Sequence, residues 1–510
     1  HLLRRTTFGP GKPDFVEALS LGMADSVAAL LAEQPAPSPP VYYDYDGNPD
    51  VPLGASWVNA PYFNAAEEVA PRNRSYRSWV GKQLREDRTI TEKMTLFWHN
   101  HFGVTFNGDP LARYSYNALL RNYATGNFKS LLEEVTIHPA MLSFLNGNQN
   151  TRNSPNENYG RELLELFTVG KGPQIDEGDY TNYTETDVRE LARALTGWVI
   201  RGNLSTVAGE TIRSEYIPNR HDTDQKQLSY HFNDRIIENG DDQEYLEVIN
   251  ILTDQLETAR FICRDLYRFF VYYDISEQEE EEIIEPLAQL LYDNNYEIRP
   301  VLTTLLSSEH FYDMLNRGPM IKTPIDFTLS MLRPFEYDHV DQTETVALAT
   351  LNLRMLTQFT TMGMDYFSPP TVSGWEAWYQ APNYTRSWIN GSTLQVRTQL
   401  ANLFTGNGFN IGGVRFRFQF VEWVEQLENP AEINSMIEEI TTIFLPRPLV
   451  EEQLLALKEF VIPGLPDFEW SDEYGAYLGD PENEMLYTGI ENKLKSLFRA
   501  IFNLAEFHLS

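Results

Sequence analysis

The sequence predicts a mainly α-helical protein, a large multi-helix globular array with long loops and at most short strands. Apolar side chains recur at helical spacing over most long segments, and prolines and glycines fall mainly between them. The chain has 510 residues and is 42% hydrophobic, which is enough for a large buried core. The clearest helical segments are residues 15–33, 246–272, 279–292, 323–334 and 491–504.

Charge and cysteine content exclude several classes of protein. The formal net charge of −33 repels phosphate backbones and anionic lipid, so we expect neither nucleic-acid binding nor docking on an anionic membrane. The sequence contains no window of about 18 apolar residues, so we expect no transmembrane helix. The single cysteine, Cys263, allows no internal disulfide, and its amphipathic helical surroundings predict a buried, inert thiol.

The chain divides loosely into two helical parts. Residues 1–340 carry the histidine and Asn/Glu motifs, with a loop insertion at about 201–243 that contains short strands near 211–213 and 227–232. Residues 341–510 form the second part, after a soft boundary near 338–345. Because residues 367–388 are expected to return to the first part, we predict that the two parts pack as one unit.

An arginine- and glutamate-rich helix is predicted to follow an asparagine-rich loop. Ser154 is the expected N-cap and Glu157 its capping-box partner. Polar side chains then share one face by their spacing of three and four: Asn158, Arg161, Glu162 and Glu165. Two interpretations are open. In a solvated stripe Arg161 would pair with Glu165, whereas in a cleft wall Glu162 and Glu165 would be acid–base groups or ligands and Arg161 would bind an anion.

Two histidines lie near the end of a helix predicted to run from Ile90 toward Gly103. Within a helix His99 and His101 would diverge and could not bind one metal ion. If the helix ended near His99, the extended tail would align them as a metal pair, with Glu162 as a further ligand. The alternatives are buried, hydrogen-bonded histidines or a metal-free catalytic role.

Four weaker features also bear on function. In the insertion, His221 beside Asp222, with Lys226 nearby, is either an oriented base with an anion-binding lysine or a charged turn. Oxygen-bearing side chains alternate at Asp44, Asp46, Asn48 and Asp50, as in a calcium loop, although a plain turn explains them too. The aromatic residues of 367–388 either fill a core or stack on sugars. Lys322, before a helix start, is either a buried cation or a surface side chain.

Long motifs occur at several places in the chain: HLLRR at 1–5, FWHNHF at 97–102, PNENYGRELLELF at 155–167 and DVRELARALTGW at 187–198, with IKTP at 321–324 as a further match. Together they resemble one bacterial family, domain of unknown function 1800, over nearly the whole chain. The resemblance implies an exported, mostly helical protein found in the periplasm, on the cell surface or secreted. It also implies an exported sulfatase-like partner protein, but no established chemistry.

These observations lead to three hypotheses, of which the third is a structural protein stabilised by calcium. The first is an exported hydrolase-type enzyme that acts on an extracellular polymer, with or without a divalent cation (calcium or a transition metal). Its cleft would gather the following residues: His99, His101, Glu157, Arg161, Glu162, Glu165, His221 and Lys226. The second is a non-catalytic cell-surface or scaffold protein that binds glycans or an exported partner. The first hypothesis requires imidazoles and carboxylates from distant segments to share one accessible pocket.

Overall fold

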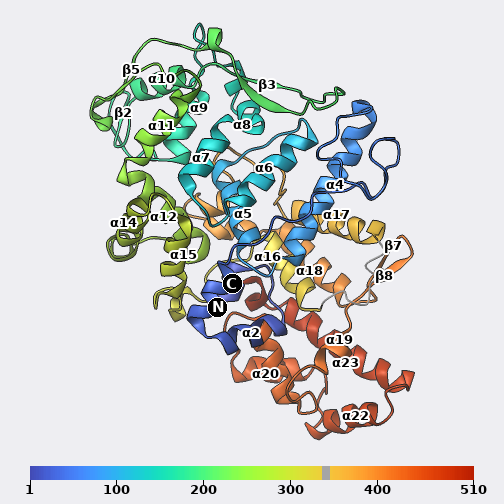
Figure 1. Ribbon diagram of the computed structural model, residues 1–510. Helices are drawn as coiled ribbons and strands as arrows, with labels where there is room; N and C mark the ends of the chain where they lie inside the picture. The colour runs from blue at the N-terminus through green and yellow to red at the C-terminus, as the bar shows by residue number, and fades with distance from the viewer. Residues whose placement is uncertain (336–344) are drawn as a thin grey trace.

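The computed structural model describes residues 1–335 and 345–510 and confirms the mainly α fold. Helices of different lengths pack around one another, and the strands form only two-stranded antiparallel sheets (Figure 1). The predicted boundary near 338–345 falls outside the described residues except for Thr345. The division into two parts therefore stays a prediction.

The first stretch of helices contains both motif-bearing helices. Its elements are α1 (Leu2–Thr6), α2 (Lys12–Leu21), α3 (Met23–Leu30), α4 (Ala65–Glu86), α5 (Thr91–Phe102), α6 (Pro110–Asn122), α7 (Phe128–Ile137), α8 (Pro139–Phe144), α9 (Glu157–Glu162) and the π-helical turn η2 (Leu163–Phe167). The helix predicted over 15–33 is interrupted by Gly22, whose φ of 77° breaks it into α2 and α3.

Short hairpins occupy the loop regions. They are β1 (Gln174–Asp176) with β2 (Asp179–Tyr180), β3 (Trp198–Arg201) with β4 (Arg213–Tyr216), β5 (Lys226–Gln227) with β6 (Ile236–Ile237), and β7 (Phe409–Ile411) with β8 (Val414–Phe416). In the β3–β4 ladder Trp198 lies opposite Tyr216 and Arg201 opposite Arg213. The insertion therefore contains short strands as predicted, displaced by a few residues.

The remaining helices follow in two groups. Before residue 336 they are α10 (Glu185–Ala194), α11 (Glu244–Thr253), α12 (Leu256–Phe270), α13 (Glu277–Glu279), α14 (Glu285–Asp293), α15 (Ile298–Ser307) and α16 (Pro324–Leu332). After residue 344 they are α17 (Thr345–Thr361), α18 (Gly391–Phe404), α19 (Phe420–Val424), α20 (Ile433–Phe444), α21 (Glu451–Lys458), α22 (Phe468–Gly479) and α23 (Glu484–Phe502).

Contacts cross between the two parts at several places. Phe335 stacks on Phe418 with ring centroids 4.3 Å apart, and the Trp423 indole donates a hydrogen bond of 2.9 Å to the Pro334 carbonyl. The two ends of the chain also meet near the middle of the molecule (Figure 1), where the Lys322 amide donates to the His508 carbonyl at 2.8 Å. Helix α4 of the first part and helix α17 of the second part also pack along one another.

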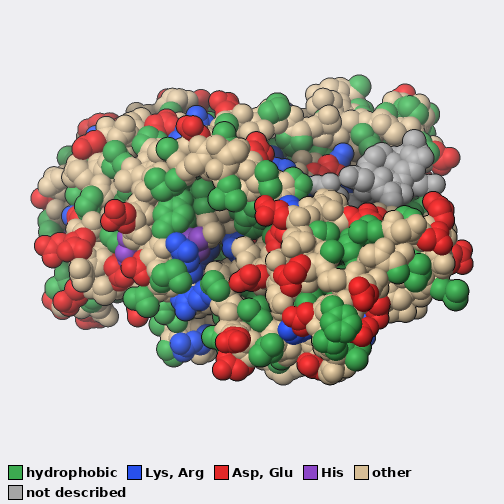
Figure 2. Space-filling view, turned by 90° about the horizontal axis from the view of Figure 1, so that it is seen from below, with side chains coloured by type: hydrophobic (Ala, Val, Ile, Leu, Met, Phe, Trp, Pro, Cys, Tyr) green, Lys and Arg blue, Asp and Glu red, His purple; other side chains and the backbone are tan. Residues whose placement is uncertain are grey.

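Acidic side chains are spread over the face seen in Figure 2, whereas lysine and arginine side chains gather mainly left of its centre. This distribution agrees with the formal charge of −33. A surface of this kind attracts cations and repels polyanions.

Within residues 1–335 and 345–510, no helix combines the length and the apolar character needed to cross a bilayer.

Candidate functional site

One pocket brings together polar motifs that lie far apart in the sequence. It lies between α5, the π-helical turn η2, α12 and the segment 373–379, and its volume is about 210 Å³. Its walls carry five aromatic side chains and four charged or titratable ones. The aromatic residues are Phe97, Phe261, Phe269, Trp378 and Tyr379, and the others are His101, Glu165, Asp265 and Arg268. Among the motif residues predicted from the sequence, His101 and Glu165 line this pocket.

The end of α5 fixes the direction of His101. The helix continues through Phe102 and ends at Gly103, whose φ of 56° is left-handed and whose amide donates to the His99 carbonyl. A side chain at Gly103 would lie 2.3 Å from the Val372 carbonyl oxygen, so the loop before the pocket packs directly on this turn. Because His101 is helical, its ring points into the pocket while His99 points elsewhere.

His101, Asp265 and Arg268 form a chain of polar contacts at the base of the pocket. The His101 Nδ1 lies 3.4 Å from an Asp265 carboxylate oxygen, and its Nε2 lies 3.3 Å from the Phe167 carbonyl. Arg268 approaches the other Asp265 oxygen at 3.6 Å. A neutral imidazole has one N–H, so it can donate to only one of its two acceptors at a time. The His101 side chain is 2% exposed and that of Asp265 28%, so Asp265 is the member of this pair that a ligand can reach.

Glu165 enters the pocket from a π-helical turn. Such turns insert an extra residue into a helix and are frequent at functional sites. The Tyr183 hydroxyl donates to the Glu165 carboxylate at 2.9 Å, and Lys171 lies 3.5 Å from the same oxygen. Burial, followed by the neighbouring Glu165 charge, raises the pKa of the Tyr183 hydroxyl. Tyr183 therefore stays protonated as a donor to Glu165.

The predicted pairing along the arginine–glutamate helix is wrong. Arg161 binds Glu185 at 2.7 Å and Glu157 at 3.3 Å, and it does not pair with Glu165. The π turn after Glu162 rotates Glu165 away from the face of Arg161. The helix also begins later than predicted, because Asn156 and not Ser154 accepts the capping hydrogen bond.

Three of the predicted site residues on this helix lie outside the pocket. Arg161 and Glu157 are held in the ion-pair group with Glu185, and Glu162 is partly buried but does not line the cavity. Burial and the charge of Glu165 raise the pKa of the Glu162 carboxyl. Glu162 is therefore a carboxyl group close to Glu165 that forms no part of the pocket wall.

His99 belongs to a different part of the molecule. Its ring packs against Tyr116, Tyr366 and Trp375, and its Nε2 lies 2.7 Å from the Tyr366 carbonyl. Burial lowers the pKa of His99 to about 4, so the ring is a neutral donor that ties α5 to the segment after α17. The structure therefore does not place His99, His101 and Glu162 around a common metal ion. Among the described residues, no group of three or more His, Cys, Asp or Glu side chains is arranged to hold one.

The lowered pKa of His99 predicts loss of stability in acid. Below pH 6.5 the unfolded chain takes up a proton at this ring, whereas the folded protein does so only near its pKa of about 4. The free energy of unfolding should therefore fall as the pH drops through this range, by about 2 kcal/mol at pH 5 from His99 alone. His138 and His508, whose pKa values burial also lowers to about 4, act in the same direction.

Urea unfolding of the wild type and of His99→Gln at pH 7 and pH 5 measures this contribution. The variant, which carries no titrating ring, should lose about 2 kcal/mol less between the two pH values. Equal losses in the two proteins would contradict the prediction.

His221 and Lys226 are also separated from the pocket. Both side chains are fully buried against Glu244 of α11, with His221 Nε2 at 3.0 Å and Lys226 Nζ at 2.5 Å from its carboxylate oxygens. Burial alone would lower the pKa of His221, but its hydrogen bonds to Glu244 and the Thr196 carbonyl outweigh burial and raise it. The cluster joins the insertion to α11 and offers no surface to a substrate, which corrects the predicted catalytic role of these two residues.

The predicted calcium loop is occupied by protein contacts. Asp44 pairs with Arg74 at 2.8 Å, and the Asn48 amide donates to the buried Glu68 at 2.9 Å. Its oxygen accepts from the Asp50 amide, which is an Asx turn. Asp46 and Asp50 are exposed, so the four oxygen-bearing side chains do not converge on a cation.

Sequence reasoning missed half of the polar pocket. Asp265 and Arg268 lie on α12, where their spacing of three is typical of an ordinary solvated pair on an amphipathic helix. Phe261 and Phe269 lie on the same helix and line the pocket, but in the sequence they are typical of core residues. Only the packing of α12 against α5 shows that these four residues face His101.

The fold and the pocket define a mainly helical protein with a small cavity whose walls carry aromatic and charged side chains. Residues 1–507 match the family described as "Protein of unknown function (DUF1800)", so the chain belongs to this family and the predicted resemblance is confirmed. Neither the curated proteins nor the solved structures that were compared give a match. Any function is therefore argued from the pocket itself.

Proposed function

We propose that this chain is a hydrolase-type enzyme that acts on an extracellular glycan and binds one sugar unit in the pocket between α5, η2, α12 and 373–379. The observation that carries the proposal is the combination of the aromatic walls with His101, Asp265 and Glu165 in one cavity. Aromatic faces bind the apolar faces of sugars, and carboxyl groups around one bound unit supply general acid and base. The volume of about 210 Å³ is below the roughly 300–1,000 Å³ of sites for drug-sized ligands, which favours a single unit of a longer chain.

Each polar group has a distinct role in this proposal. Asp265, oriented by His101 and Arg268, is one proton-transfer group. Glu165, held by Tyr183 and Lys171, is the second. The Arg268 Nε is buried without a hydrogen-bond partner among the described residues, which leaves a donor near the bound unit. Tyr379, with 39% of its surface exposed, forms the outer aromatic wall.

The test combines isosteric variants with a panel of soluble polysaccharides bearing neutral, acidic and sulfated sugars. Glu165→Gln and Asp265→Asn should each lower the release of reducing ends by about 10²- to 10⁴-fold while sugar binding persists. Glu162→Gln is the matched control, since Glu162 is a nearby carboxylate on the preceding helix that does not line the pocket. Tyr379→Ala should raise KM more than it lowers kcat, because the ring contacts the unit without taking part in proton transfer.

A non-catalytic role is the second candidate, and a specific observation favours it. Glu165 and Asp265 both already contact protein groups, which is typical of charges that shape a binding surface. In that case the wild type would bind glycan without releasing reducing ends, and neither carboxylate variant would differ from Glu162→Gln in turnover. Tyr379→Ala would still weaken binding. Turnover in the wild type therefore separates the two candidates.

The proposal also includes export from the cytoplasm and a sulfatase-like partner protein. What supports both is membership of the family, which the resemblance associates with exported proteins. Fractionation of cells that express the natural protein, followed by capture of bound proteins from the extracytoplasmic fraction, tests location and partner together.

A further inference from the structure

Several buried cations surround one carboxylate where the two ends of the chain meet. Asp326 lies in the first turn of α16 and binds Lys93 of α5. Further positive side chains lie around this pair: Arg4 and Arg5 of α1, Lys322 before α16 and Arg397 of α18. Among the described residues none of these four side chains has a carboxylate within 4.0 Å. Positive charge therefore exceeds negative charge within this cluster, although the whole protein has a net charge of −33.

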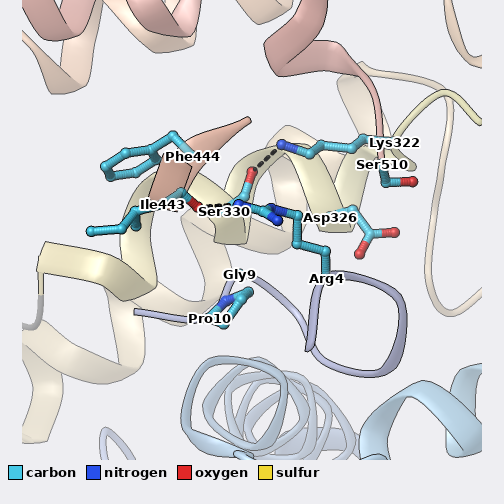
Figure 3. A pocket seen from close by; sticks show the side chains of 9 residues that line it. All are labelled: Arg4, Gly9, Pro10, Lys322, Asp326, Ser330, Ile443, Phe444 and Ser510. Atoms are coloured by element: carbon cyan, nitrogen blue, oxygen red, sulfur yellow. Dashed lines mark hydrogen bonds between the residues drawn. The ribbon is translucent and has the colours of Figure 1, made fainter. Parts of the chain in front are cut away.

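Lys322 faces a small cavity beside this cluster. The cavity has a volume of about 20 Å³ and lies between Lys322, Ser330, Arg4 and the turn at Gly9 and Pro10, with Asp326 and Ser510 also in its wall (Figure 3). Lys322 is 5% exposed, and its ammonium group donates to the Ser330 hydroxyl at 3.3 Å and lies 4.0 Å above the Phe507 ring. An ammonium group has three donors, and burial of a charge is costly unless an opposite charge compensates it.

Other donors in the cluster also lack acceptors. The Nε atoms of Arg5 and Arg397 are buried without a hydrogen-bond partner among the described residues. Arg5 lines a second cavity of about 20 Å³ together with Arg4, Lys93 and Asp326. Burial, followed by repulsion from Arg4, lowers the pKa of Lys322 to about 7. The charge of Asp326 opposes this shift, but the pKa of Lys322 stays lowered, so the protein compensates the ammonium group only in part and an anion beside it would complete the compensation.

We propose that the cavity at Lys322 is a site for a monatomic anion of the halide class, physiologically chloride, with the Lys322 ammonium group as its principal ligand. The Arg4 guanidinium lines the same cavity while it also donates to the Ile443 carbonyl at 2.9 Å near the end of α20 (Figure 3). The size of the cavity favours a monatomic anion, because a water-sized particle needs roughly 10–15 Å³ and the cavity has a volume of about 20 Å³. A sulfate or phosphate group, with several oxygens, would have to displace the surrounding side chains.

The site would link three segments of the chain. Arg4 belongs to α1, Ile443 and Phe444 lie at the end of α20, and Lys322 precedes α16, which contains Ser330. An anion that binds the folded protein and not the unfolded chain stabilises the fold in proportion to its occupancy. Chloride is therefore expected to act here as a structural ligand, independently of the pocket at His101.

Thermal unfolding in potassium chloride and in potassium gluconate at equal ionic strength tests the proposal. The wild type should melt about 1–3 °C higher in chloride, with a saturating dose dependence. In Lys322→Met the two salts should give the same melting temperature, and in gluconate this variant should be at least as stable as the wild type because an uncompensated buried charge is gone. Lys82→Met, which removes an exposed lysine of α4, is the charge-matched control and should keep the chloride effect.

Crystals of the wild type soaked in bromide provide a second readout that needs no variant. An anomalous peak beside Lys322 Nζ is expected. Equal melting of the wild type in both salts, or the lack of a bromide peak at this position, would overturn the proposal. Stabilisation by sulfate or phosphate in place of chloride would overturn the assignment to a halide.

Discussion

Glu244→Gln is expected to lower the free energy of unfolding by about 3–5 kcal/mol, because it leaves two basic groups buried without their common anion. Glu244 contacts His221 at 3.0 Å and Lys226 at 2.5 Å, and all three side chains are fully buried. Glutamine keeps the shape of the side chain and removes its charge. The Lys226 ammonium group then has no carboxylate partner in a site that water does not reach, and it must either deprotonate or open the insertion.

An exposed ion pair formed by another glutamate of α11 provides the control. Glu247 pairs with Arg235 at 2.7 Å, but their side chains are 40% and 42% exposed, so Glu247→Gln should cost about 0–1 kcal/mol. Adding Lys226→Met to Glu244→Gln should recover much of the loss, since the unpaired charge is removed. Chemical denaturation measures all three variants. A cost for Glu244→Gln no larger than that for Glu247→Gln would show that the buried cluster does not hold the insertion in place.

The helical fold could be predicted from the sequence because helical periodicity is a local property. The predicted segment 323–334 contains α16. The predicted segment 491–504 lies largely in α23, which begins earlier, at Glu484, and whose buried residues recur at helical spacing. One interruption depended on a single residue with an unusual backbone conformation. Gly22 divides one predicted helix because its positive φ is compatible with the end of α2 and not with its continuation.

The candidate site was predicted only in part because it depends on helix phase and on long-range packing. An ideal periodicity of 3.6 residues places Arg161 next to Glu165, but the π turn at Leu163–Phe167 shifts the phase and directs Glu165 toward His101. The sequence carries no sign of this turn. His221 and Lys226 were predicted as site residues because a lysine near a histidine is compatible with catalysis and with a buried ion cluster alike, and only their burial against Glu244 decides between the two.

Gly374→Ala is expected to lower the free energy of unfolding by about 3 kcal/mol or more and to abolish ligand binding in the pocket. Gly374 has a φ of 81°, and a Cβ atom there would lie 2.2 Å from the Asn100 side-chain oxygen. The same oxygen accepts a hydrogen bond of 2.9 Å from the Trp375 amide, which holds the segment 373–379 on α5. Alanine would push this segment away, and with it the Trp378 and Tyr379 walls of the pocket.

Gly363→Ala separates steric clash from backbone strain. Gly363 has a φ of 92°, and nothing lies within 4 Å of the position of its Cβ, so alanine there should cost only about 1–2 kcal/mol of left-handed strain. Denaturant unfolding of both variants gives the free energy of unfolding that each one loses. The larger loss expected for Gly374→Ala measures the clash with α5. Adding Asn100→Ala should not restore the stability of Gly374→Ala, because the Asn100 backbone carbonyl oxygen also lies 2.5 Å from the new methyl group. Full recovery in that double variant would mean that the Asn100 side chain alone sets the distance between the segment 373–379 and α5.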